Sequence, residues 1–192
     1  MKYAWTLMVA VLLAGCTAGP PQTVLPDMTF ANMTPIRIDA AKVAVVDRYQ
    51  SPMQRPDVEY DFSPQPAVAA EKMLKRQLVA AGGTDVLRAV IEEASVVRKD
   101  LPAHSSLTGI LMQAPAVQLT AVMKVRFELF DPAAPDIILG HAEVIARRVK
   151  TIDEGLSPDE RARAYFDLTE ELMNNLNAGM QSVIKKTFGV KD

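Results

Sequence analysis

Few side chains in this sequence have the types and spacing that enzyme catalysis requires. His104 and Ser105 are adjacent and Asp100 lies just upstream, so the three could supply a base, a nucleophile and an orienting acid. The members of a catalytic triad come from separate elements that fix their geometry, whereas these three share one segment that contains Pro102. The sequence also lacks the Gly-x-Ser-x-Gly turn of serine hydrolases. We therefore expect no catalytic residues and no enzymatic activity.

Metal ligands are equally sparse. The two histidines, His104 and His141, are far apart in the chain, and Cys16 is the only cysteine, whereas a structural zinc site takes four nitrogen or sulfur ligands. One acidic group lacks the ligand spacing of a calcium-binding loop, and acids at the start of a helix are explained by its dipole. This group consists of Asp153, Glu154, Asp159 and Glu160. We expect no metal and no cofactor.

Cys16 follows a short N-terminal segment with the features of a processed signal. Lys2 gives a basic start, residues 7–13 form an uncharged apolar run, and the small residues Ala14 and Gly15 stand directly before the cysteine. A run of this length is too short to cross a hydrocarbon core about 30 Å thick, which needs roughly 20 residues. The pattern therefore favours a signal peptide over a transmembrane helix.

The stretch Leu13-Ala14-Gly15-Cys16 resembles the lipobox of bacterial lipoproteins. That resemblance implies removal of residues 1–15, acylation of Cys16 and attachment to a membrane, where each buried methylene contributes about 0.8 kcal/mol. In lipoproteins of this kind an Asp after the cysteine favours the inner membrane, and here that position is Thr17. We therefore expect a lipid-anchored protein on the periplasmic face of the outer membrane rather than the inner one.

Composition limits the partners. The chain has 192 residues and a formal net charge of −2, without a basic stripe, which argues against nucleic acid. Residues 16–35 are rich in proline and small polar residues, and they predict a lipidated N-terminus and a flexible tether, with room for part of it to be ordered. About 19 extended residues span roughly 60 Å. Residues 36–192 then form a single domain.

Hydrophobic periodicity predicts two helices and four strands. A strand within 36–49 is followed by a helix over 67–81 that Gly82 and Gly83 end. Three strands come next, over 85–98 with a bulge near Glu92-Glu93, over 117–130 and over 137–150. A long helix then starts at the capping box of Ser157 and Glu160 and ends at Gly189.

The element order β-α-β-β-β-α predicts an α+β fold, a four-stranded mostly antiparallel sheet with two helices packed on one face. With the lipobox and the length, this order resembles two classes of small envelope lipoproteins. One is the lipoprotein partner of the lipopolysaccharide-assembly translocon, and the other comprises the auxiliary lipoproteins of ABC-type lipid transport. Neither class is enzymatic, so the resemblance implies an accessory subunit of an envelope protein complex. The alternative is a periplasmic module that holds a lipid or other apolar ligand between helices and sheet.

Two loops combine prolines with apolar side chains, and each is a candidate contact with a partner or simply packed against the domain. Within residues 50–66 the candidates are Met53, Val58, Tyr60 and Phe62. Within residues 101–116 they are Leu107, Ile110, Leu111 and Met112. A third surface, on the last helix, carries Asn174, Asn175 and Asn177, either as a polar patch that a partner recognises or as a solvated face.

Overall fold

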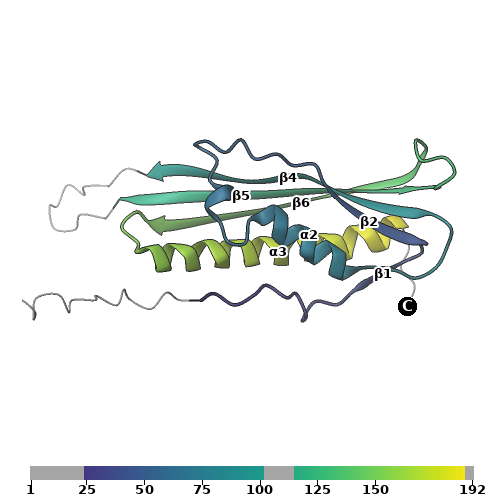
Figure 1. Ribbon diagram of the computed structural model, residues 1–192, viewed down its shortest axis with the longest axis horizontal. Coiled ribbons are helices and arrows are strands. Elements are labelled where there is room, and N and C mark those ends of the chain that lie inside the picture. The colour runs from purple at the N-terminus through teal and green to yellow at the C-terminus, as the bar shows by residue number, and fades with distance from the viewer. Residues whose placement is uncertain (1–23, 102–114, 189–192) are drawn as a thin grey trace, which may run out of the picture.

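A mixed sheet and two helices form two layers in the computed structural model, which describes residues 24–101 and 115–188 (Figure 1). The sheet has the order β2-β4-β5-β6, in which β2 is parallel to β4 and the other pairs are antiparallel. The strands are β2 (Lys42–Asp47), β4 (Val86–Leu101), β5 (Ala116–Phe130) and β6 (Ile138–Asp153). Helix α2 (Pro66–Gln77) covers β2 and β4, and helix α3 (Pro158–Phe188) covers β6 and β5. The predicted α+β fold is confirmed.

Strand β5 shows why one face of the sheet is covered. Its residues alternate between buried and half-buried positions along most of its length, as expected for a strand with one face on the core. The covered face meets α2 and α3 through side chains that are fully buried. These are Met73, Leu74, Leu119, Met123, Phe127, Leu168, Leu172 and Met173.

The opposite face of the sheet carries paired charges. Arg126 contacts Glu92 at 2.7 Å, and Lys124 contacts Glu92 at 3.2 Å and Glu143 at 3.0 Å. Arg88 contacts Glu128 at 2.7 Å. Because each charge here has an opposite neighbour on an adjacent strand, this part of the open face has no charge excess that would select a ligand.

Helix α3 begins and packs as its sequence predicts. Ser157 Oγ accepts the backbone N–H of Glu160 at 3.3 Å, and the Glu160 carboxylate accepts the Ser157 N–H at 2.9 Å, which completes the capping box. Further along, Gly179 lies against β6, where an added Cβ would stand 2.5 Å from Cγ1 of Val144. The absence of a side chain at Gly179 therefore lets the helix approach the sheet closely.

The first half of the domain departs from the prediction in two places. The strand expected over 36–49 is divided into β1 (Ile36–Ile38) and β2, because the chain turns at the buried Ala40, whose N–H donates to the Ile38 carbonyl. The helix expected over 67–81 ends at Gln77, because residues 78–80 form strand β3 (Leu78–Ala80) parallel to β1. The predicted bulge in β4 is confirmed, with a register shift between Ile91 and Glu93.

Residues 24–35, named here the N-terminal strap, lie along the two helices (Figure 1). Met28 and Phe30 of the strap are buried in the core. Three side chains of the helices bind it. Lys72 Nζ contacts the Asp27 carboxylate at 2.6 Å, Gln77 Nε2 donates to the Phe30 carbonyl at 3.2 Å, and Gln181 Nε2 donates to the Thr34 carbonyl at 2.9 Å. Part of the segment expected to be a tether therefore belongs to the domain.

Candidate functional site

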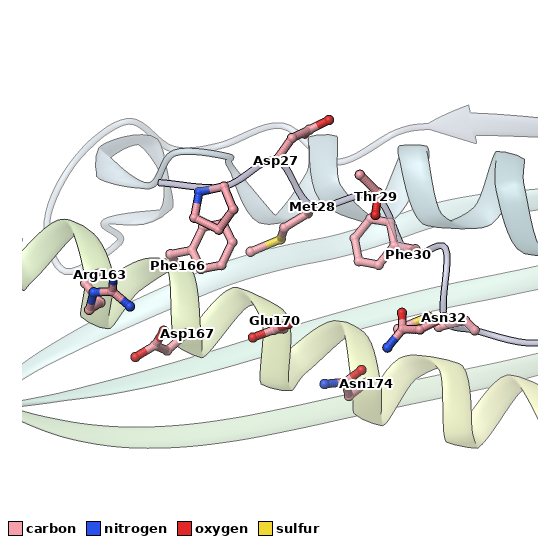
Figure 2. Close-up of a pocket in the computed structure, with 12 residues that line it drawn as sticks. Asp27, Met28, Thr29, Phe30, Asn32, Arg163, Phe166, Asp167, Glu170 and Asn174 are labelled. Carbon is pink, nitrogen blue, oxygen red and sulfur yellow. The ribbon is translucent and has the colours of Figure 1, made fainter. Parts of the chain in front are cut away.

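A groove lies between the N-terminal strap and α3 (Figure 2). Its volume is about 320 Å³. In Figure 2 the strap runs along one side and the helix along the other, with Asn32 on the strap facing Asn174 on the helix. The polar lining residues are Asp27, Thr29, Asn32, Arg163, Asp167, Glu170 and Asn174. The apolar lining residues are Pro26, Met28, Phe30, Met33 and Phe166.

A second groove, of about 440 Å³, continues the first toward the end of α3. The two grooves share Asn32, Met33 and Asn174. The added lining residues are Thr34, Asn177, Gln181 and Lys185, so the second groove is also predominantly polar. We call the two together the amide groove.

Several side chains of the amide groove have hydrogen-bonding capacity to spare. Within the described residues, the side chains of Asn32 and Asn174 form no hydrogen bond with protein, and Asn177 Oδ1 is a buried acceptor without a partner. A buried acceptor left unpaired costs about 1–3 kcal/mol. The neighbouring Asn175 differs, because it accepts from Arg148 Nη2 at 2.9 Å and donates to the Arg147 carbonyl at 3.2 Å. The asparagines of this run thus divide into one that holds β6 and two that line a groove.

Backbone hydrogen bonds and one buried carboxylate hold the proline-rich segment to β4. Glu59, in the short 3₁₀ helix η2 (Glu59–Asp61), is buried and accepts hydrogen bonds from Tyr49 Oη at 2.8 Å and from Ser51 Oγ. The backbone N–H of Val96 also donates to Glu59, at 3.4 Å. Burial alone would raise the pKa of Glu59, but the hydrogen bonds from Ser51 and Tyr49 hold it below its usual value. Burial and the bond to Glu59 in turn raise the pKa of Tyr49.

This attachment determines where the predicted contact residues of the segment lie. Val58 and Phe62 are buried, and the ring of Phe62 stacks on that of Tyr165 of α3 with centroids 4.1 Å apart. Tyr60 is half-buried. Met53 alone is broadly exposed, at 65% of its maximal area. The packing alternative therefore accounts for Val58 and Phe62, and among the four candidate residues the exposed apolar surface is confined to Met53 and part of Tyr60.

The hairpin between β5 and β6 exposes a larger apolar surface, at the right of Figure 1. Ile137, Ile138 and Leu139 are consecutive and are 61%, 40% and 56% exposed. Gly140 follows, and an added Cβ there would stand 3.3 Å from Phe188 at the end of α3. We call residues 137–139 the aliphatic tip. The predicted strand over 137–150 includes these residues, and β6 begins at Ile138. Their uninterrupted apolar run beside Pro135 is the signal that indicates exposure.

The remaining predicted site residues are placed as follows. His141 is exposed on β6. Residue Cys16 lies outside the described residues, as do Leu107, Ile110, Leu111, Met112, His104 and Ser105. In the part of the chain that the structure describes, no group of three or more His, Cys, Asp or Glu side chains could hold a metal ion. Over the same residues, no helix combines the length and the apolar character needed to span a membrane.

Buried side chains fill the interface between helices and sheet, which is where the alternative prediction places an apolar ligand. Met73 and Leu74 of α2 and Leu172 and Met173 of α3 are fully buried there. The grooves described above lie instead along the N-terminal strap, on the outer side of α3. The packing of these side chains therefore does not support an apolar ligand between the two layers.

Comparisons with known proteins give structural likeness without sequence relatives. No family model and no curated protein matches the chain. A minor lipoprotein from Acinetobacter baumannii is 11% identical, with a TM-score of 0.38, and the match covers 76% of this chain and 96% of that one. Rare lipoprotein B from Shewanella oneidensis is also 11% identical, with a TM-score of 0.35, and the match covers 73% of this chain and 92% of that one.

A third solved structure, a homolog of neuraminyllactose-binding hemagglutinin from Helicobacter pylori, is 9% identical with a TM-score of 0.36. The match covers 83% of this chain and 97% of that one. All three TM-scores lie below 0.5 and all three identities near one tenth. These likenesses establish neither a shared family nor a shared function.

Proposed function

We propose that this chain is a non-catalytic lipoprotein of the bacterial envelope, anchored by acyl groups on Cys16, that acts as an accessory subunit of an envelope-assembly or lipid-transport complex. The lipobox-like stretch before Cys16 supports the anchor. Thr17 supports the periplasmic face of the outer membrane as the location. The aliphatic tip supports the role as a subunit, and it is the observation that carries the proposal.

The aliphatic tip has the properties of a docking surface. A run of three large aliphatic side chains in water is costly, at about 25 cal/mol for each Å² left exposed. Contiguous exposed apolar patches are characteristic of interaction sites. Asp131 and Asp136 flank the tip and are exposed. Their negative charges favour a protein partner over insertion of the tip into an anionic membrane surface.

The positions of the tip and the N-terminal strap fit such a role. Leu25 and Pro26 of the strap line a hollow with Ala162 near the start of α3, whereas the tip adjoins Phe188 at its end. Phe188 is 26 positions after Ala162, which corresponds to about 40 Å of helix. Seven residues separate Cys16 from Val24, and the eight steps between them reach at most about 29 Å. The domain thus presents its apolar tip well away from the point where the tether enters it.

The test is affinity purification of the full-length chain from its own envelope after mild crosslinking. We expect a larger envelope complex to be recovered at a constant ratio to the chain. A Cys16→Ser chain, which cannot carry the acyl groups, should lose both the membrane association and most of the complex. Recovery of the acylated chain alone, or of the same complex from the Cys16→Ser chain, contradicts the proposal.

A further inference from the structure

The amide groove is separate from the aliphatic tip, and its lining points to a ligand of its own. Asn32 and Asn174 lie on opposite walls (Figure 2), and Asn177 lines the continuation. Each asparagine offers a carbonyl acceptor and two N–H donors on one planar group. A ligand hydroxyl is likewise both donor and acceptor. Several side-chain amides in a row can therefore form hydrogen bonds with several ligand hydroxyls, and neither partner needs to carry a charge.

The charges of the groove do not select an ion. Arg163 and Lys185 contribute positive charge, whereas Asp27, Asp167 and Glu170 contribute negative charge along the same walls. An anion or a cation would therefore meet repulsion from part of the lining. A neutral, multiply hydroxylated ligand meets charged acceptors and donors of both kinds, which form stronger hydrogen bonds than neutral groups do.

From these observations we infer that the amide groove binds an oligosaccharide, with Asn32, Asn174 and Asn177 as its principal hydrogen-bonding residues. The helix between Arg163 and Lys185 runs for about 33 Å, which is long enough for several sugar units. This inference does not depend on the proposed role of the aliphatic tip.

The groove fits an extended peptide less well. Peptides that bind along a protein commonly add to a sheet edge or insert apolar anchors into pockets. The strap residues that form the wall, 26–34, contain no strand. The apolar side chains of Met28 and Phe30, which line the groove, are themselves buried in the core. A peptide would therefore find no strand to pair with along this wall, and the hollow with apolar lining at Leu25, Pro64 and Phe166 lies beside one end of the amide groove rather than along it.

The test follows the side-chain amide signals by NMR. The full chain, purified from its own membrane, labelled with ¹⁵N and held in a polyoxyethylene detergent, is titrated to millimolar concentration with tetra-N-acetylchitotetraose, maltotetraose and a glycine-serine octapeptide. We expect the signals of Asn32, Asn174 and Asn177 to shift with at least one sugar and not with the peptide. The Asn175 signals, which report on the bonds to β6, should not move.

Two matched variants complete the test. Asn174→Ala should weaken binding of the sugar about tenfold, whereas Asn175→Ala should leave sugar binding unchanged while lowering the melting temperature. The inference is overturned if neither sugar shifts the groove amides, if the peptide shifts them and the sugars do not, or if both variants weaken binding equally. A folded-state spectrum of Asn174→Ala confirms that a loss of binding is not a loss of structure.

Discussion

Two proline-containing connections of this domain have similar composition, but one buries its apolar side chains and the other exposes them. The segment over residues 50–65 places Val58 and Phe62 in the core. The hairpin over residues 131–139 leaves Ile137, Ile138 and Leu139 in solvent. Both join elements at the surface and both combine prolines, acids and large apolar residues. Their difference shows that apolar content does not by itself decide whether a loop is packed or offered to a partner.

The two connections differ in their long-range hydrogen bonds. In the first, Glu59 is bound by Tyr49 and by the N–H of Val96 on β4, and the Val58 N–H donates to the Val96 carbonyl at 2.8 Å. In the hairpin, the Asp131 carboxylate accepts the Ala133 N–H at 2.8 Å, and the Asp131 carbonyl accepts the Ala134 N–H at 2.9 Å, so both bonds lie within the turn. A loop tied to the sheet by a buried carboxylate packs its apolar side chains, whereas a loop closed on itself exposes them.

Among changes to the two connections, removal of the aromatic contact of Phe62 should lower the free energy of unfolding most. Phe62→Ala deletes a buried ring that stacks on Tyr165, and we expect it to lower the free energy of unfolding by about 4 kcal/mol. Met53→Ala, in the same segment, removes an exposed side chain and should change it by less than about 0.5 kcal/mol. Denaturant titration of both variants measures the difference, and equal effects would show that the segment is not packed.

Loss of the carboxylate should have the next largest effect. Glu59→Gln keeps the shape but offers one acceptor oxygen for the bonds from Tyr49, Ser51 and Val96, and we expect about 2 kcal/mol of destabilisation. Tyr49→Phe removes only one donor and should cost about 1 kcal/mol. Hydrogen exchange at Val58 and Val96 should accelerate in Glu59→Gln. Unchanged exchange there would mean that Glu59 does not hold the segment.

Acid should weaken the same attachment. The pKa of Glu59 is lower in the folded state than its ordinary value of 4.5. Its ionised form therefore contributes stability above about pH 4.5, and that contribution is lost as the pH falls through the lower, folded-state pKa. The unfolding free energy of Glu59→Gln should accordingly fall less between pH 5 and pH 3 than that of the unaltered chain. Parallel pH curves for the two proteins would contradict this account.

Changes at the aliphatic tip should have the smallest effect on stability. Ile137→Ser and Leu139→Ser alter exposed side chains, so we expect the unfolding free energy to change by no more than about 0.5 kcal/mol each. Thermal denaturation of the double variant measures this. A large loss of stability would show that the tip packs on the domain, as the proline-rich segment does, and would remove the contrast between the two connections.

The sequence predicted the elements whose signals are local. The alternation along β5, the bulge near Glu93 and the capping box of Ser157 and Glu160 are each contained in a few consecutive residues, and all three are confirmed. The end of α2 was missed, because residues 78–80 leave the helix to pair with β1, some forty positions earlier in the chain. The residues around Leu78 carry no pattern that predicts pairing with β1.

The candidate sites were less predictable for the same reason. The residues around Phe30 carry no pattern that predicts burial. Phe30 is buried because the N-terminal strap packs on the two helices, where Gln77 binds its carbonyl. The division between Asn174 and Asn175 depends on which side of α3 faces β6, which sequence spacing alone did not settle. The aliphatic tip was visible as a run of apolar residues, but its exposure depends on where the hairpin lies relative to the end of α3, which no local pattern gives.

The most direct test of the proposed docking role compares how much of the partner complex is recovered when the aliphatic tip or the proline-rich segment is altered. The full-length acylated chain, the double variant Ile137→Ser with Leu139→Ser, and Met53→Ser as a matched exposed control are each purified from the envelope after mild crosslinking. We expect the unaltered chain and Met53→Ser to recover the same complex, and the tip variant to lose it while remaining folded and membrane-bound. Undiminished recovery with the tip variant would contradict the proposal that the aliphatic tip docks the partner.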